Sequence, residues 1–145
     1  MNEKENNSGG FYISNSKFIN NTSEYGTFLN VPFLNKNTGT GIEIHTSEFT
    51  NNTASKFGGI IYSLGEYNNY HMKLVNNQYN NNNAKLGNII YSYSLNSLPD
   101  IVSDNINKDD IVTLPSYFEV DKNSYEDDEI TILSGESIPD GITCM

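Results

Sequence analysis

Apolar residues recur at the same offsets in three consecutive stretches of the chain. The aromatic residues that align the copies are 31 and then 30 residues apart: Phe18, Phe49 and Tyr79. Two further apolar rows precede them by five and seven positions: Ile13, Ile44 and Leu74, and Phe11, Ile42 and Met72. The alternation in Ile42–His45 and Met72–Leu74 predicts strands with one buried face. The odd step of five residues predicts a bend between two short strands whose side chains both point inward.

Each repeat continues with a polar turn and a glycine. Paired asparagines follow the aromatic residue: Asn20-Asn21, Asn51-Asn52 and Asn81-Asn82. Asparagine favours turns, and stacked copies of its side chain can form a ladder. A tight corner is expected at the small residues that come next: Ser23, Ala54 and Ala84. After a glycine (Gly26, Gly58 and Gly87), another short strand is expected at the apolar pairs Phe28-Leu29, Ile60-Ile61 and Ile89-Ile90.

These repeats predict an all-β protein. One repeat cannot bury its own apolar face, whereas stacked repeats can pack aromatic on aromatic and aliphatic on aliphatic side chains. We therefore expect a parallel β-helix of about three coils over residues 9–99. A β-sandwich is the alternative, but it does not require the same residue types at the same offsets in consecutive repeats. Gly9-Gly10-Phe11 opens the first coil without a polar cap, so we expect this coil to stack on coils or a cap outside the chain.

The composition changes between Leu95 and Pro115, and the repeat stops in this stretch. Residues 100–145 contain twelve carboxylates and two lysines, whereas residues 1–99 contain six glutamates, six lysines and no aspartate. The net charge of −10 therefore belongs to the tail. Alternating residues predict strands at Tyr117–Val120 and Glu129–Leu133. Because two or three strands do not form an independent β-domain, we expect residues 100–145 to be an acidic linker and a partial, truncated β-domain.

Charge and hydropathy exclude several classes of partner. The chain has no arginine and its first 99 residues are neutral, which makes a poor surface for nucleic acid. No apolar run reaches the eighteen residues that would indicate membrane insertion. The single cysteine, Cys144, can form no disulfide within the chain. Residues 1–8 lack the apolar stretch of a secretory signal, so the protein is either intracellular or a piece of a longer chain.

The pattern S-x-F-x-N-N-T-A followed by G-G-x-I-Y-S, which spans Ser47–Ser63, resembles the pectin-lyase-like right-handed β-helix repeats of large surface proteins. These include polymorphic outer-membrane proteins and adhesin-like proteins of gut microbes. The asparagine-rich, arginine-free style and the tail motif Ile132–Pro139 resemble β-helix ectodomains of anaerobic fungi. In those proteins a β-sandwich-like segment follows the β-helix, and some continue into a receptor-type membrane domain. The resemblance covers about residues 9–140 and implies a right-handed parallel β-helix at the cell surface or outside the cell.

Enzymes with the fold implied by this resemblance mostly act on acidic polysaccharides. They use an arginine base with calcium-binding aspartates, or several aspartates on one face. This chain has no arginine, and no aspartate before residue 100, so neither set can be transferred to any position. Glu43 with Glu48 is an imaginable acid-base pair, but glutamates that flank a buried strand are interpreted as surface charge. We expect no catalytic residue and no cofactor, and we predict that the segment is not an enzyme.

The potential metal ligands are also interpreted as surface residues. His45 and His71 occupy nonequivalent offsets, and no cysteine lies near them. Asp109-Asp110 and Asp127–Glu129 lack the spacing of a calcium loop and are expected to be solvated loops. No metal site is therefore predicted.

Tyrosines are the candidate ligand-contact residues. Tyr62 and Tyr91 occupy equivalent positions, and Tyr67, Tyr70 and Tyr93 lie in or near the loops between repeats, where binding usually occurs. Their aromatic faces can bind sugars or partner proteins, and the alternative for Tyr62 and Tyr91 is a further packing row. Three asparagines begin glycosylation sequons that matter only in a secreted protein: Asn20, Asn21 and Asn51.

The sequence therefore predicts a non-catalytic structural or adhesive segment of an extracellular or cell-surface protein, such as a stalk, an adhesin or the outer part of a receptor. The expected partner is a polysaccharide or a cell-surface protein. Two alternatives stay open. One is a carbohydrate-active β-helix whose active coils lie outside this chain, and the other is a sugar-binding module that uses Tyr62 and Tyr91.

Overall fold

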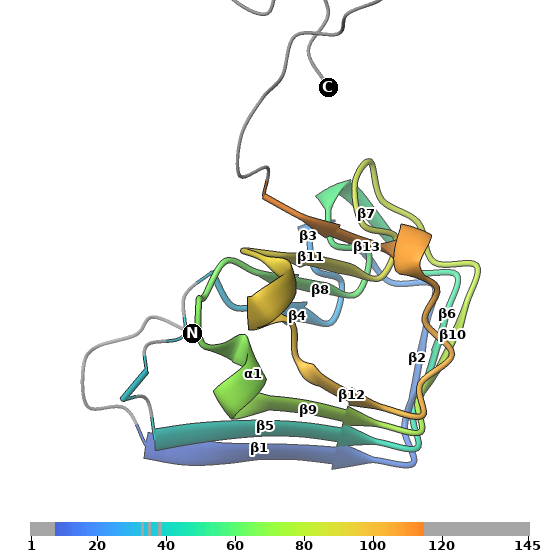
Figure 1. Ribbon diagram of the computed structural model, residues 1–145. Helices are drawn as coiled ribbons and strands as arrows, with labels where there is room; N and C mark the ends of the chain where they lie inside the picture. The colour runs from blue at the N-terminus through green and yellow to red at the C-terminus, as the bar shows by residue number, and fades with distance from the viewer. Residues whose placement is uncertain (1–7, 33, 35, 38, 115–145) are drawn as a thin grey trace, which may run out of the picture. The chain divides into compact units, whose positions relative to one another are not determined.

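The computed structural model describes residues 8–32, 34, 36–37 and 39–114. The chain divides into two units after Leu114, and all of the described residues lie in the first unit. They form thirteen strands, one four-residue α-helix and two short 3-10 helices (Figure 1). The all-β class expected from the sequence is confirmed over this range. The strands expected at Tyr117–Val120 and Glu129–Leu133 lie outside the described residues.

The strands form four sheets in which every pair of neighbours is parallel. The first sheet contains β1 (Ser8–Ser14), β5 (Gly39–His45), β9 (Met72–Val75) and β12 (Asp100–Val102). The second contains β2 (Lys17–Ile19), β6 (Glu48–Thr50) and β10 (Gln78–Asn80). The third contains β3 (Thr22–Tyr25) and β7 (Thr53–Phe57). The fourth contains β4 (Leu29–Asn30), β8 (Ile61–Ser63), β11 (Ile90–Ser92) and β13 (Ile111–Thr113).

Three short helical segments lie between the strands. These are α1 (Asn68–His71), η1 (Leu95–Ser97) and η2 (Lys108–Asp110). The first two repeats pass through the sheets in one order, β1 to β4 and then β5 to β8, so equivalent strands become neighbours (Figure 1). In the third repeat, isolated bridges at Asn83 and Leu86 continue the third sheet.

The predicted apolar rows are confirmed by the strand register. Phe49 of β6 pairs with Phe18 of β2 on one side and with Tyr79 of β10 on the other. Its ring stacks on both, with centroid distances of 5.0 Å to Phe18 and 5.2 Å to Tyr79. In the first sheet Ile44 pairs with Ile13 and Leu74. Each residue of a row therefore packs against the equivalent residues of the neighbouring repeats. This stacking is how each repeat buries its apolar face.

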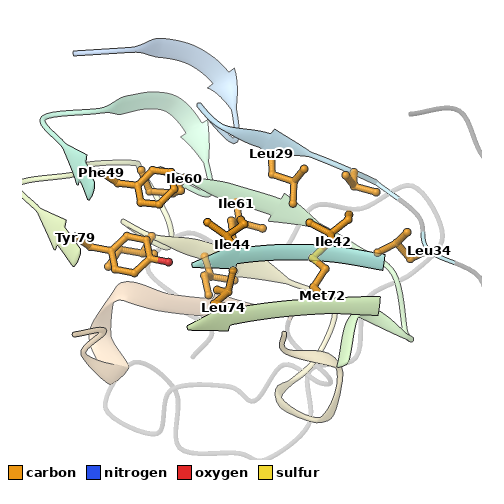
Figure 2. Close-up of a cluster of buried hydrophobic side chains, with 13 residues drawn as sticks. Leu29, Leu34, Ile42, Ile44, Phe49, Ile60, Ile61, Met72, Leu74 and Tyr79 are labelled. Atoms are coloured by element: carbon orange, nitrogen blue, oxygen red, sulfur yellow. The ribbon is translucent and has the colours of Figure 1, made fainter. Parts of the chain in front are cut away.

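The core lies between the sheets and contains the inward-facing members of these rows, together with Val31 and Leu34 from the segment between β4 and β5 (Figure 2). Seven of its side chains have no exposed surface: Ile42, Ile44, Phe49, Ile60, Ile61, Leu74 and Ile90. Ile44 and Phe49 are both fully buried although five residues separate them, so the predicted bend between β5 and β6 is confirmed.

Asparagine makes the predicted turns and the predicted ladder. Asn20, Asn51 and Asn81 all have positive φ, between 51° and 57°. The next asparagine in each repeat points its amide along the row. Nδ2 of Asn21 donates to Oδ1 of Asn52 at 2.9 Å, and Nδ2 of Asn52 donates to Oδ1 of Asn82 at 3.0 Å. The predicted bend between the first and second sheets is a second corner with positive φ, at Asn15, Thr46, Asn76 and Ser103, and the sequence did not predict this backbone conformation.

The corner expected at Ser23 and Ala54 was wrong. Both residues lie inside paired strands, β3 and β7, and Ala54 is 1% exposed. A small side chain is present at this position because it faces inward and has little space. The chain turns instead at the next glycine of the repeat. Gly58 has a φ of +63°, and a Cβ at this position would lie 2.2 Å from the Ile61 carbonyl oxygen.

The sheets continue past residue 99, the expected end of the repeats. β12 pairs with β9 and β13 pairs with β11, so the chain keeps this architecture to Thr113. The change in composition hides these strands because few of their positions have to be apolar. Ile101 lies beside Leu74 and Ile111 beside Ile90, and four aspartates, a residue type absent from the earlier repeats, stand among the apolar residues of this stretch: Asp100, Asp104, Asp109 and Asp110.

Candidate functional site

Tyr62 and Tyr91 lie side by side in β8 and β11, and their rings stack at a centroid distance of 5.9 Å. Phe57 stacks on Tyr91 at 4.9 Å, and the ring of Tyr25 lies 4.9 Å from that of Tyr62. Tyr91 is only 6% exposed. Burial raises the pKa of both tyrosines. This geometry favours the packing interpretation of Tyr62 and Tyr91, because their neighbours cover the faces on which a sugar would stack.

The loop tyrosines are more accessible. Tyr70 in α1 is 70% exposed, Tyr93 is 40% exposed, and the Tyr67 ring meets that of Tyr70 edge to face at 6.1 Å. α1 lies next to η1, whose Leu95 is 73% exposed. Tyr67, Tyr70, Tyr93 and Leu95 are called the loop face below. This surface can offer aromatic and apolar contacts to a partner.

Asn68 anchors the loop face, and the sequence did not single it out. Its side chain is fully buried. Oδ1 accepts a hydrogen bond from Oγ of Ser63 at 2.7 Å, and Nδ2 donates to Oγ of Ser92 at 3.3 Å. Asn68 therefore ties α1 to the ends of β8 and β11. The exposed position of Tyr70 depends on this buried amide two residues earlier.

A polar groove of about 390 Å³ lies where strands of the first sheet turn into strands of the second. All three repeats contribute to its lining: Asn15, Ser16 and Lys17 from the first, Thr46, Ser47 and Glu48 from the second, and Asn76, Gln78 and Asn80 from the third. The left-handed residues of the second corner form one side, and the outward-facing residues of β2, β6 and β10 form the other. The groove therefore crosses three consecutive repeats.

One ion pair lies in the groove. Nζ of Lys17 is 2.8 Å from Oε2 of Glu48, and Oε1 of Glu48 accepts a hydrogen bond from Oγ1 of Thr50 at 3.0 Å. The hydrogen bond to Glu48 raises the pKa of Lys17, and the same bond is the main cause of a lowered pKa at Glu48. The two charges compensate each other, so the groove carries no net charge.

Most of the remaining polar groups in the groove are available to a ligand. The serines are occupied: Oγ of Ser16 donates to the Ser14 carbonyl and Oγ of Ser47 to the His45 carbonyl, both at 2.9 Å. Five other side chains have no hydrogen-bond partner among the described residues: Asn15, Thr46, Asn76, Gln78 and Asn80. Four of these are amides, each of which can both donate and accept.

The imagined pair of Glu43 and Glu48 is not brought together as an acid-base site. Oε2 of Glu43 lies 3.0 Å from Nε2 of His45 in β5, whereas Glu48 pairs with Lys17 in the second sheet. The His45 ring also lies 5.1 Å from that of Tyr12. These contacts place each glutamate beside a different partner on the surface.

The other potential ligands lie apart. His71 ends α1, and Asp110 in η2 accepts hydrogen bonds from the side chains of Asn88 and Asn107. Within residues 8–32, 34, 36–37 and 39–114, no three His, Cys, Asp or Glu side chains are grouped so that they could hold a metal ion. Asp127–Glu129 lies outside the described residues.

The sequons differ in accessibility. Asn20 and Asn51 are exposed turn residues, whereas Nδ2 of Asn21 takes part in the ladder. A glycan on Asn21 would therefore compete with a hydrogen bond to Asn52.

The groove is the feature that the sequence interpretation missed. Its signal was a polar triplet directly before each aromatic anchor: Asn15-Ser16-Lys17, Thr46-Ser47-Glu48 and Asn76-Asn77-Gln78. These outward-facing residues vary in type from repeat to repeat, so they do not stand out as a recurring motif.

No protein-family model matches the chain, and no curated protein or solved structure matches it either. The part of the chain that the structure describes contains no helix with the length and hydrophobicity of a membrane span.

Proposed function

We propose that residues 9–114 are a right-handed parallel β-helix that serves as a non-catalytic structural and adhesive segment of an extracellular or cell-surface protein. The architecture is supported by four parallel sheets, in each of which equivalent strands of successive repeats are neighbours. A chain that visits several sheets in turn and places each repeat beside the previous one winds as a solenoid.

One observation carries the non-catalytic role: the recurring side chains form contacts within and between repeats. Phe49 stacks on its equivalents, Asn52 bonds to its equivalents, and Gly58 allows a corner. General acid-base catalysis on a glycosidic bond needs two carboxyl groups that converge on one substrate atom or water. Glu43 and Glu48, the pair suggested by the sequence, engage His45 and Lys17 instead.

The adhesive role is supported by the loop face. Tyr70 and Leu95 expose about seven tenths of their surface, on segments held in place by the buried Asn68. Rigidly held, exposed aromatic residues are typical of surfaces that bind partners. A polysaccharide or a cell-surface protein is the partner class that fits a surface segment of this kind.

A turnover assay tests the proposal. The intact protein, incubated with pectin and polygalacturonate, is expected to release no new reducing ends and no unsaturated products, while a pectate lyase run in parallel does. Turnover that the double variant Glu43→Gln/Glu48→Gln abolishes would place a catalytic site in this segment and overturn the proposal. Turnover that survives in this variant would favour the alternative of an enzyme whose active coils lie outside the described residues.

A further inference from the structure

We propose that the polar groove is a binding site for a neutral, hydroxyl-rich polysaccharide chain that runs across the three repeats. The inference rests on the proposed adhesive function and names the ligand class and the surface that binds it. The loop face is a separate surface, so the two can be tested independently.

The shape of the groove indicates an elongated ligand with a repeating structure. Strands β2, β6 and β10 are in register, with Lys17 opposite Glu48 and Glu48 opposite Gln78. Neighbouring strands lie about 4.8 Å apart, so equivalent groove residues recur at this interval. A polymer whose units carry equivalent hydroxyl groups can meet one repeat after another, whereas a compact molecule would contact only part of the groove.

The charge of the groove indicates a neutral ligand. Lys17 and Glu48 are paired at 2.8 Å, and Lys17 is the only cationic side chain among the described residues that line the groove. An acidic polymer would meet the Glu48 carboxylate and could bind Lys17 only by displacing it. A neutral polymer leaves the ion pair intact.

The chemistry of the free groups indicates hydroxyls. Asn15, Asn76, Gln78 and Asn80 each offer an amide N–H and a carbonyl oxygen, and Thr46 offers a hydroxyl. A sugar hydroxyl also donates and accepts, so it can satisfy both halves of such an amide. Exposed amides such as these hydrogen-bond to water in the free protein. Binding replaces those hydrogen bonds with bonds to sugar hydroxyls, which can likewise donate and accept.

An extended peptide fits the groove less well. Peptides commonly bind by adding a strand to a free sheet edge, with apolar pockets for alternate side chains. β6, in the centre of the groove, is paired on both sides, with β2 and β10. All nine lining residues have polar side chains, although their apolar atoms supply more of the lining surface than their polar atoms do. A peptide therefore finds no open edge at β6, and the free edge of this sheet lies at β2.

Affinity electrophoresis of the full chain in gels containing mannan, xylan, polygalacturonate or gelatin tests the proposal. We expect at least one of the neutral glycans to retard the protein and polygalacturonate not to. The double variant Gln78→Ala/Asn80→Ala removes two exposed amides with no partner, so it should fold normally and bind about tenfold more weakly, the change expected when two modest hydrogen bonds are lost. The matched control Asn69→Ala/Asn96→Ala removes two exposed amides near the loop face and should bind like the wild type.

Three outcomes would overturn the proposal. One is that neither neutral glycan retards the protein. Another is retardation by polygalacturonate or gelatin alone, which would indicate an acidic or a peptide ligand. The third is binding that Tyr70→Ala abolishes while the groove variant leaves it unchanged. This last result would place the binding site at the loop face, and the proposed adhesive function would still hold. The proposed non-catalytic function is tested separately, by the assay of pectin turnover.

Discussion

Asn52 shows how one side chain joins three repeats. It is fully buried, and its Oδ1 accepts hydrogen bonds from the backbone N–H and the side chain of Asn21, both at 2.9 Å. Its Nδ2 donates to Oδ1 of Asn82 and to the Phe18 carbonyl. All hydrogen-bonding capacity of the amide is therefore used inside the protein.

Asn52→Ala should lower the free energy of unfolding by about 3 kcal/mol, because several buried partners lose their hydrogen bonds at once. Urea denaturation measures the loss. Asn80→Ala is the matched control: Asn80 is exposed, its side chain has no partner among the described residues, and the variant should change stability by less than about 0.5 kcal/mol. Equal losses in the two variants would mean that the ladder contributes nothing.

Phe49 plays the corresponding part in the apolar rows. Its ring has no exposed surface and stacks on Phe18 and Tyr79. We expect Phe49→Ala to destabilise by about 3 to 5 kcal/mol, as large cavities in cores do. Tyr12→Ala, at a site that is 64% exposed, serves as the comparison and should cost much less. A loss below about 1 kcal/mol at Phe49 would contradict its place in the core.

Tyr79 gives the protein a dependence on alkaline pH. Burial, and then the neighbouring Asp104 carboxylate, raise the pKa of Tyr79 above its ordinary value of 10.0. Its hydroxyl donates to Oδ2 of Asp104 at 3.0 Å. Below pH 10 the tyrosine is protonated in both the folded and the unfolded chain. Above pH 10 the unfolded chain loses this proton and the folded chain keeps it, so the free energy of unfolding falls as the pH rises.

The size of this effect can be read from the Tyr79→Phe variant. Between about pH 10 and pH 11 the wild type should lose about 1 kcal/mol more stability than the variant, and the difference should approach about 1.4 kcal/mol per pH unit above that range. At neutral pH the variant should be less stable by about 1 kcal/mol, because the hydrogen bond to Asp104 is gone. Parallel slopes for the two proteins in alkaline urea titrations would show that Tyr79 ionises equally easily in both states.

At the scale of the elements, the glycine corner decides how β7 connects to β8. A Cβ on Gly58 would lie 2.2 Å from the Ile61 carbonyl oxygen, and its φ of +63° disfavours any L side chain. Gly58→Ala should therefore destabilise by about 3 kcal/mol, the sum of left-handed strain and backbone displacement. Gly41→Ala is the control, since nothing lies within 4 Å of its added Cβ. Thermal unfolding should separate the two variants, and similar midpoints would rule out a special role for this corner.

The sequence predicted those elements in which both the buried positions and the turn positions require a particular type of residue. The step from Ile44 to Phe49 and the asparagine pairs allowed β5, β6 and the turn after them to be located before the structure was known. β7 was mistaken for a corner because Ala54 is small. Smallness fits a confined inward-facing position as well as a turn, and only the strand pairing distinguishes the two.

At the scale of the whole molecule, the candidate surfaces were harder to predict than the core. A buried row must keep one residue type, so it repeats visibly, whereas outward-facing rows vary, as Lys17, Glu48 and Gln78 do. The loops around Tyr70 and Tyr93 were predicted as the exposed positions, and they are exposed. The groove depends on the angle between two sheets at Thr46, a property that no single repeat reveals.

In the second sheet, side chains take the place of a fourth strand. Asp104 accepts a hydrogen bond from the backbone N–H of Asn77 at 2.8 Å, where the preceding repeats use Asn77 and Ser47 in the same role. Asn105 then pairs with the edge of β10. Its Oδ1 accepts from the Tyr79 N–H at 2.8 Å, and its Nδ2 donates to the Tyr79 carbonyl at 3.3 Å. One amide side chain thus replaces the backbone of a further strand.

Covering an exposed edge prevents pairing with other chains and holds the last strand in place. Asn105→Ala should therefore speed hydrogen exchange of the Tyr79 amide by about tenfold and cost about 1 to 2 kcal/mol in unfolding free energy, since two hydrogen bonds are lost. Asn107→Ala, which removes an exposed amide that donates to Asp110 at 3.4 Å and not to Tyr79, should leave exchange at Tyr79 unchanged. If Asn105→Ala also leaves it unchanged, Asn105 is not the cap. If exchange quickens and the variant associates at high concentration, the cap is what keeps the second sheet from adding strands from another chain.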